Sequence, residues 1–383
     1  MTQYRLTKMD EWPRHQTGGT FDVVVDGSAH WSDGFYFTMG DPTGEVAWFA
    51  GFRLHANNDV LDAFICVSAA GRQYNMRWSR RLRPQIDDLV CGPMAIEIVE
   101  GLRTLRVTAG PNEYGIECEL QWDGFCPPYN EDRVVTIING RLHSDRSNYD
   151  QCSTVTGWIE FGGRRVEVTR WTGVRDHSWG VGNNTGGPRS RATAPPPDAP
   201  ELPGLRQWCV FKMRDRSIFW QFHHSRHGKY TKVETQCMFP YGSTTEPFAY
   251  TALRHLDAEW VERDGQALRR LRAVTIELTR PDEAIESYRV EPISFPVYMQ
   301  GGGYWAGYDD GLGRGVYRGD LHHEGEEWDI SHPTRVVEPK GIVRFRSDAW
   351  AEAWGRCTNL DDPSDVGDGH LECVVVGPYP GFA

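Results

Sequence analysis

The sequence has no long apolar run, so it offers no helix that could span a bilayer. Residues 1–5 also lack the apolar core of a secretion signal. From these two absences we expect no stable membrane insertion.

Paired cysteines and excess positive charge are missing as well. The nine cysteines are odd in number, irregularly spaced and contain no CxxC pair, which predicts reduced thiols and hence a cytoplasmic protein. Lys and Arg number 41 against 53 Asp and Glu, and the net charge of -12 argues against nucleic acid and anionic membranes as partners.

The common cofactor and metal motifs are also missing. The sequence has no nucleophile elbow and no Rossmann fingerprint, and the triple glycine at 301–303 is not followed by the Lys-Ser/Thr of a phosphate loop. His223, His224 and His227 stand near no cysteine or carboxylate at the usual ligand spacing. We therefore expect neither a metal nor a cofactor.

Helix signals are scarce, and residues 347–357 are the one fair candidate. Short strands separated by turn residues recur at roughly ten-residue intervals, as at 30–37, 46–54, 207–213 and 217–223. This rhythm predicts an all-β fold of two consecutive lipocalin-like or β-sandwich domains. We place the domains at 1–182 and 205–383, with the Gly/Pro-rich stretch 183–204 as a linker or flap.

The densest group of reactive side chains is Arg175-Asp176-His177-Ser178-Trp179, with a glycine on either side at 173 and 180. An alternating strand at 165–171 leads into it, so we expect the group where that strand ends. In an extended chain Arg175, His177 and Trp179 share one face, and Asp176 and Ser178 share the other.

The stretch Arg-Asp-His-Ser-Trp-Gly at 175–180, preceded by the hairpin 149–164, resembles the signature of the carotenoid 1,2-hydratase / AttH-like superfamily. That superfamily includes tocopherol cyclases and fungal Diels–Alderases and has two lipocalin-like domains. The resemblance implies that His177 and Trp179 belong to an active site, together with a tyrosine and an acidic residue farther along the chain.

Proton transfer is the chemistry these residues suggest. Burial raises the pKa of a carboxyl, so Asp176 could act as an acid, with His177 moving a proton or orienting water. Tyr308 and Asp309 are our candidates for the downstream pair, although we favour a structural β-bulge as the explanation of that stretch. A further alternative is that Arg175 and Asp176 form a buried ion pair that only clamps the fold.

Aromatic and polar side chains complete the predicted substrate pocket. We expect it to be lined by Arg175, Trp179, Trp208, Trp220, Phe222, His223, Tyr304 and Trp305. The resulting hypothesis is a cofactor-independent hydratase, cyclase or isomerase that protonates a C=C bond of a hydrophobic, terpenoid or polycyclic, small molecule. The alternative is a carrier of hydrophobic ligands without turnover. Assembly into a homo-oligomer is left open.

Overall fold

The computed structural model describes residues 6–11, 13–182, 204–332, 335–337, 343–345 and 351–382. Within these ranges the helical elements are three 3-10 helices, η1 (Lys8–Glu11), η2 (Ala56–Asn58) and η3 (Met299–Gly302), and the other regular structure is β-strand. The all-β fold is confirmed. No helix in this part of the chain is long and apolar enough to cross a membrane.

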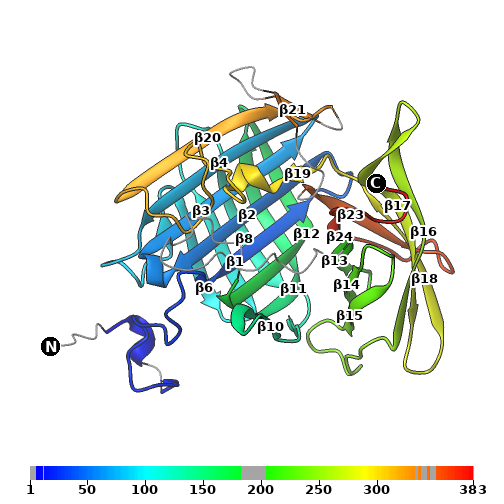
Figure 1. Ribbon diagram of the computed structural model, residues 1–383, viewed down its shortest axis with the longest axis horizontal. Coiled ribbons are helices and arrows are strands. Elements are labelled where there is room, and N and C mark those ends of the chain that lie inside the picture. The colour runs from blue at the N-terminus through cyan, green and yellow to red at the C-terminus, as the bar shows by residue number, and fades with distance from the viewer. Residues whose placement is uncertain are drawn as a thin grey trace.

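The first sheet has fifteen strands (Figure 1). In sheet order they are β22 (Val343–Phe345), β21 (Arg335–Val337), β20 (Leu321–Asp329), β4 (Arg72–Arg81), β3 (Val60–Ala69), β2 (Val46–His55), β1 (Trp31–Gly40), β12 (Arg164–Val181), β11 (Arg141–Phe161), β8 (Glu117–Gly124), β7 (Thr104–Ala109), β6 (Met94–Glu100) and β5 (Val90–Cys91), with β9 (Tyr129–Asn130) and β10 (Val134–Ile138) also paired to β11.

The second sheet has nine strands. Their order is β15 (Tyr230–Met238), β14 (Ser217–His224), β13 (Leu205–Lys212), β24 (Val366–Val375), β23 (Ala351–Asn359), β18 (Ile285–Pro292), β17 (Gln266–Thr279) and β16 (Ala252–Arg263), with β19 (Val297–Tyr298) paired to β23.

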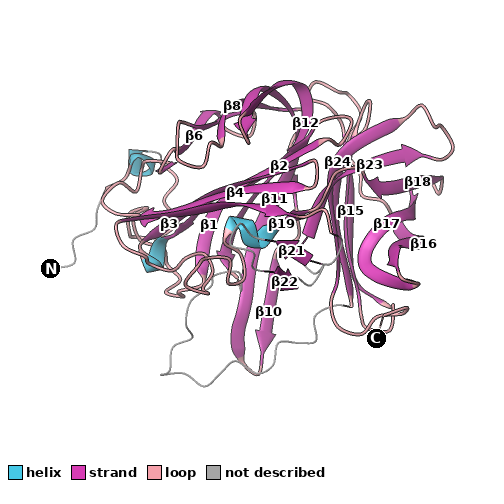
Figure 2. Cartoon of the chain, turned by 90° about the horizontal axis from the view of Figure 1, so that it is seen from above, coloured by secondary structure: helices cyan, strands magenta, loops and turns pink. Residues whose placement is uncertain are grey.

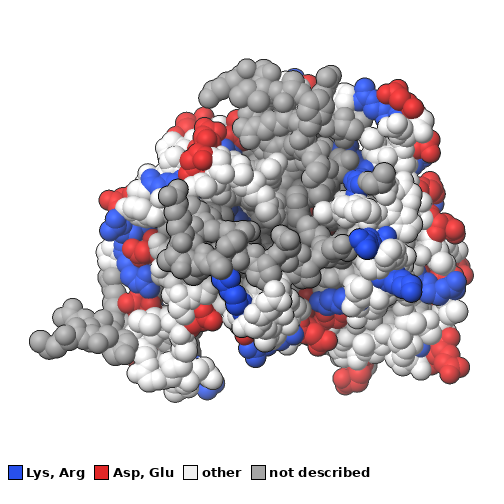
Figure 3. Space-filling model, in the orientation of Figure 1, with Lys and Arg blue, Asp and Glu red and all other residues white. Residues whose placement is uncertain are grey.

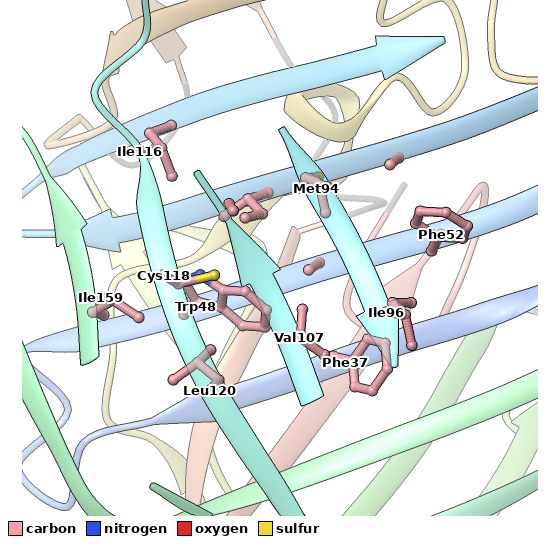
Figure 4. Packing of buried hydrophobic residues seen from close by; sticks show 14 of the residues in the cluster. Phe37, Trp48, Phe52, Met94, Ile96, Val107, Ile116, Cys118, Leu120 and Ile159 are labelled. Atoms are coloured by element: carbon pink, nitrogen blue, oxygen red, sulfur yellow. The ribbon is translucent and has the colours of Figure 1, made fainter. Parts of the chain in front are cut away.

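The first sheet curls around its own apolar core. Side chains from β1 and β2, such as Phe37 and Trp48, point toward those of β6 to β8, such as Ile96, Val107 and Leu120 (Figure 4). Alternation along each strand sends every second side chain into this core and the others to the outer face. The outer face is therefore available to pack against the second sheet.

The two sheets meet through a mixed apolar cluster. Phe49 and Val174 of the first sheet pack with Val210, Phe219 and others of the second. β13 contacts β11, and Figures 1 and 2 show β24 beside β12. The ring of Trp354 on β23 lies against Gly40, where a Cβ would stand 2.3 Å from it. A glycine is required there because the indole fills the space of a side chain.

The division into domains at 183–204 stays a prediction, since residues 183–203 lie outside the described part. The second half of the chain contributes strands to both sheets, because β20 pairs with β4 in antiparallel fashion and β21 and β22 extend that edge. The first sheet is thus completed by residues that follow most of the second sheet in sequence.

The helix expected at 347–357 is wrong over its described part. Residues 351–359 form β23, which pairs with β18 and β24. Glu352 and Trp354 face the first sheet while Cys357 packs in the core of the second. The alanines and glycine of this stretch are therefore small residues in a period-two pattern, and neighbouring strands outweigh their helix propensity.

Candidate active site between the sheets

The Arg-Asp-His-Ser-Trp-Gly stretch forms the C-terminal part of β12 itself, whereas we expected it to follow the strand. The strand continues to Val181 and pairs with β1 on one side and β11 on the other. Neighbours on both sides hold the motif in place, so its side chains strictly alternate between the two faces of the sheet.

Arg175 and His177 face the core side of the first sheet. The Arg175 Nε donates to Gln151 Oε1 at 2.8 Å and its Nη1 donates to the Tyr149 hydroxyl at 3.1 Å. His177 Nε2 lies 2.7 Å from Asp33 Oδ1, and its Nδ1 lies 3.3 Å from the Tyr149 hydroxyl. Asp176 points to the other face of the sheet, so the alternative of a buried Arg175–Asp176 ion pair is wrong, and the two candidate proton-transfer groups, Asp176 and His177, lie on opposite faces.

Asp176 faces the second sheet, and polar side chains from β1, β2 and β11 lie around it. Tyr36 and Asp150 are its direct partners on β1 and β11. Burial raises the pKa of Asp176, and the guanidinium groups of Arg53 and Arg146 oppose that rise. Both arginines are fixed nearby, since each donates to the Ser178 hydroxyl, at 2.7 and 2.8 Å.

Asp150 and Glu131 form an acidic pair on the same face as Asp176. The indole N–H of Trp208, from β13, lies 3.1 Å from Glu131 Oε1 and 3.4 Å from Asp150 Oδ2. Burial, together with the neighbouring Glu131 carboxyl, raises the pKa of Asp150, and burial also raises the pKa of Glu131. Two carboxyls this close favour holding at least one proton.

Glu352 projects from β23 toward the same group. The Tyr36 hydroxyl donates a short hydrogen bond to Glu352 Oε2. Burial raises the pKa of Glu352 to about 7, although the hydrogen bond from Tyr36 opposes the shift. His370 Nε2 lies 3.6 Å from the same oxygen, and burial lowers the pKa of His370 to about 3, so the imidazole is neutral.

Aromatic rings surround these carboxyls. The Trp208 ring lies 4.4 Å from that of His370 and 6.5 Å from that of Tyr36. Tyr304 lies 5.7 Å from Phe64, and the Arg314 guanidinium stacks 3.4 Å above it. Asp176 and Glu352 both influence the pKa of Tyr304, which burial raises, so this ring borders the acidic groups.

We define these side chains as the seam cluster, because they lie between the two sheets: Tyr36, Glu131, Asp150, Asp176, Trp208, Tyr304, Glu352 and His370. The Glu352 side chain is 12% exposed, and Asp176 and Tyr304 are also only partly buried. Partial accessibility of acids that are otherwise desolvated is the setting in which a carboxyl can exchange protons with a bound molecule.

Of the predicted lining residues, Trp208 and Tyr304 belong to the cluster, and Trp305 contacts Tyr304 with 5.1 Å between rings. His223 lies on β14, and burial beside Arg206 and Lys232 lowers its pKa to about 3. Trp220 and Phe222 point to the far side of the second sheet, into its own core. Alternation along β14 separates them from His223, so they line no shared pocket with it.

The remaining predicted residues lie elsewhere. Trp179 sits next to His177 on the core side of the first sheet and is 37% exposed. Tyr308 is buried beneath Arg318, whose guanidinium lies 3.7 Å from its ring. Asp309 is exposed, and its backbone N–H donates to Glu324. The structure does not bring Tyr308 and Asp309 to the seam cluster.

Sequence reasoning missed several members of the cluster: Tyr36, Glu131, Asp150, Glu352 and His370. Asp150 follows Tyr149 in the hairpin that carries the family resemblance, and Tyr36 stands in an aromatic strand, so both had a weak signal. Glu352 and His370 had none, because only the packing of β23 and β24 against the first sheet brings them there. No group of His, Cys, Asp or Glu in the described ranges has the arrangement of a metal site.

Comparison with known proteins assigns the chain to a protein family. A family model described as "Family of unknown function (DUF8625)" matches residues 6–382. The chain belongs to this family. No curated protein matches the sequence.

Solved structures with a similar course of the chain share little sequence. Kievitone hydratase from Nectria haematococca is 11% identical, with a TM-score of 0.41 over 92% of this chain and 93% of that one. CghA, solved with and without Sch210972, is 10% identical, with a TM-score of 0.48 over 92% and 90% of the two chains. The relation to the carotenoid 1,2-hydratase superfamily stays a prediction.

Proposed function

We propose that this protein is an enzyme that protonates a C=C bond of a hydrophobic small molecule between its two sheets, leading to hydration, cyclisation or isomerisation. The observation that carries the proposal is the convergence of proton-holding carboxyls and aromatic rings in the seam cluster. A carrier needs only an apolar pocket, whereas four desolvated carboxyls beside a neutral imidazole are costly to bury and favour a chemical role.

Glu352 is the acid in this proposal. A pKa of about 7 leaves it protonated about half the time near neutral pH, the range in which a general acid is most effective. Its proton passes to one alkene carbon, the π electrons form the new C–H bond, and the other carbon becomes cationic. The Tyr36 hydroxyl then stabilises the carboxylate left behind through its hydrogen bond.

The faces of Trp208 and Tyr304 supply π density for the cation, each contact being worth about 0.5–2 kcal/mol when desolvated. Addition of water forms a C–O bond and releases a proton to Glu352, which restores the acid. Loss of a neighbouring C–H proton to the same carboxylate gives an isomer. Attack by a second double bond of the substrate forms a C–C bond and a ring, and the new cation then loses a C–H proton to the Glu352 carboxylate, which restores the acid. Asp176, which raises the pKa of Glu352, acts as a positioning residue.

The test uses terpenoid and polycyclic alkenes incubated with the protein in D2O, followed by mass spectrometry. Protonation by Glu352 predicts products with deuterium on carbon, absent with Glu352→Gln. The matched control is Glu286→Gln, because Glu286 also accepts a tyrosine hydroxyl, from Tyr250, but lies away from the seam cluster. Cyclised product without deuterium would indicate a pericyclic reaction, and binding without conversion would indicate a carrier; either result contradicts the proposal.

A further inference from the structure

Arg314 is a buried cation next to the seam cluster. Its exposed fraction is 4%, and its Nε is buried without a hydrogen-bond partner. The guanidinium lies 3.4 Å from the centre of the Tyr304 ring, and within the described part of the chain it donates no hydrogen bond and forms no ion pair. Burying a guanidinium is costly unless acceptors or carboxylates surround it, so this position lacks the anion that its charge requires.

The nearest carboxyls offset this charge only in part. The positive charge of Arg314 opposes the raised pKa values of Asp62 and Glu352, so both carboxyls lie within its electrostatic range. Burial is the larger effect on each, since it raises the pKa of Asp62 and raises that of Glu352 to about 7. Both carboxyls therefore favour the neutral form more than an exposed acid does, and Arg314 keeps charge that they do not offset.

Two further arginines face the same space. Arg53 and Arg146 donate to the Ser178 hydroxyl at 2.7 and 2.8 Å, and neither forms an ion pair in the described ranges. Burial and the positive charges of Arg146 and Arg314 lower the pKa of Arg53 to about 10, so the three guanidinium groups are close enough to repel one another. The carboxyl that supports the charge of Arg53 is Asp176, whose own pKa burial raises. The three arginines thus form a region with excess positive charge.

From this arrangement we infer that the substrate of the proposed reaction is a hydrophobic alkene that carries a carboxylate, and that this carboxylate binds to Arg314 beside Arg53 and Arg146. The inference rests on the proposed function only for the reaction at the alkene. Guanidinium groups suit carboxylates because they offer two parallel N–H donors, and desolvation strengthens such pairs. Arg314 opposes the burial-driven rise in the pKa of Tyr304 while Glu352 adds to it, so this ring borders both the anion site and the acid.

Geranic acid and its methyl ester, which share one diene skeleton and differ in charge, test the inference. Each is titrated at pH 7 in a calorimeter into Glu352→Gln protein, so that binding is measured without turnover. The acid should bind at least about tenfold more tightly than the ester, because a hydrogen bond to a charged group contributes that much or more. Adding Arg314→Gln should weaken binding of the acid about tenfold and leave the ester unchanged. Arg314→Lys keeps the charge and should restore part of the preference.

A purely structural role for Arg314 gives a different result. If its contact with Tyr304 only holds the fold, Arg314→Gln lowers the melting temperature and weakens acid and ester alike, whereas removal of an unpaired buried charge leaves the melting temperature unchanged or raises it. The control is Arg165→Gln, because Arg165 also lies over an aromatic ring, 3.7 Å from that of Trp158, but is half exposed on a hairpin. This variant should change neither titration.

The outcomes separate this inference from the proposed function. Equal affinity for acid and ester, no binding of either, or equal weakening of both by Arg314→Gln would overturn the inference, even if the wild type incorporates deuterium into alkenes. A preference for the acid that depends on Arg314 supports the carboxylate site. If that preference is found but the wild type incorporates no deuterium, the carboxylate site stands and the proposed protonation is contradicted.

Discussion

Glu352 illustrates how one residue acquires its chemistry from its surroundings. Its carboxyl leaves water for a site between two sheets, where burial raises its pKa from the ordinary 4.5 to about 7. The nearby Asp176 adds to the rise, and the Tyr36 hydroxyl, Arg206 and Arg314 oppose it. The balance leaves a carboxyl that can both give and take a proton near neutral pH.

Replacing Glu352 by Gln should lower kcat/KM about 10²–10⁴-fold, the usual contribution of a general acid, with little change in KM. In the wild type, kcat/KM should be level below pH 7 and fall above it, because only the protonated carboxyl is active. A pH–rate profile on any converted alkene checks both points. A level profile from pH 5 to 9 would remove Glu352 from the mechanism.

Tyr36→Phe should move the same limb of the pH–rate profile to higher pH. The hydroxyl stabilises the charged form of Glu352, so its loss raises the pKa of that carboxyl further. Tyr250→Phe is the matched control, because Tyr250 is also buried and donates to a glutamate, Glu286, far from the seam cluster. A limb that shifts downward, or shifts equally in both variants, would contradict the assigned hydrogen bond.

Among the elements, β12 shows how far sequence reasoning reaches. Alternation predicted that Asp176 would oppose Arg175 and His177, and the hydrogen bonds of Arg175 and His177 confirm it. The same rule could not identify the partners of Asp176, because they depend on register with β1 and β11 and on the packing of β23. The regular spacing of short strands predicted the all-β fold, but the small residues in β23 led to a wrong prediction of a helix.

The two faces of β12 yield a prediction for His177. His177→Gln should cost roughly 1–2 kcal/mol of stability through its lost hydrogen bonds to Asp33 and Tyr149, while the titration of Glu352 stays in place. Asp176→Asn should instead move that titration to lower pH, because the Asp176 charge contributes to the raised pKa of Glu352. Melting temperatures and the pH–rate profile of each variant distinguish the two faces of β12. If both variants shifted the titration of Glu352 equally, the two faces would not act separately.

The packing of β1 against β23 can be tested by adding one methyl group. Gly40→Ala should cost about 1–3 kcal/mol, because its Cβ would overlap the Trp354 ring. Gly110→Ala is the control, since open space surrounds that position and no strain is expected there. Urea unfolding of both variants gives the two free energies, and an unchanged value for Gly40→Ala would mean that the sheets do not meet through this indole.

At the scale of the whole molecule, acidic and basic side chains are interspersed on the described part of the face seen in Figure 3. All nine cysteines are buried as free thiols. Burial raises the pKa of Cys152 and Cys373 to about 12, so the reactive thiolate is rare at neutral pH. The native protein should therefore react slowly with a thiol reagent at pH 8, and denaturant should release nine thiols. Rapid native labelling would contradict the packing.

Burial of acids also links folding to pH. Because the pKa of Glu352 is raised on folding, the folded state holds its proton between pH 4.5 and about 7, and stability contributed by this group falls as pH rises through that window. Glu352→Gln should therefore stabilise the protein at pH 8, by roughly 3 kcal/mol at most, and have little effect at pH 5. Unfolding free energies at the two pH values check the sign.

The most direct test of the account is the titration of Glu352 itself, which requires no substrate. Glutamate carboxyls labelled with 13C can be followed by NMR from pH 4 to 9 in the wild type and in Glu352→Gln. We predict one resonance with a midpoint near 7 that is missing from the variant and moves to higher pH in Tyr36→Phe. If the resonance that Glu352→Gln removes titrates between pH 4 and 5 like an exposed glutamate, the proton donor proposed for this protein is contradicted.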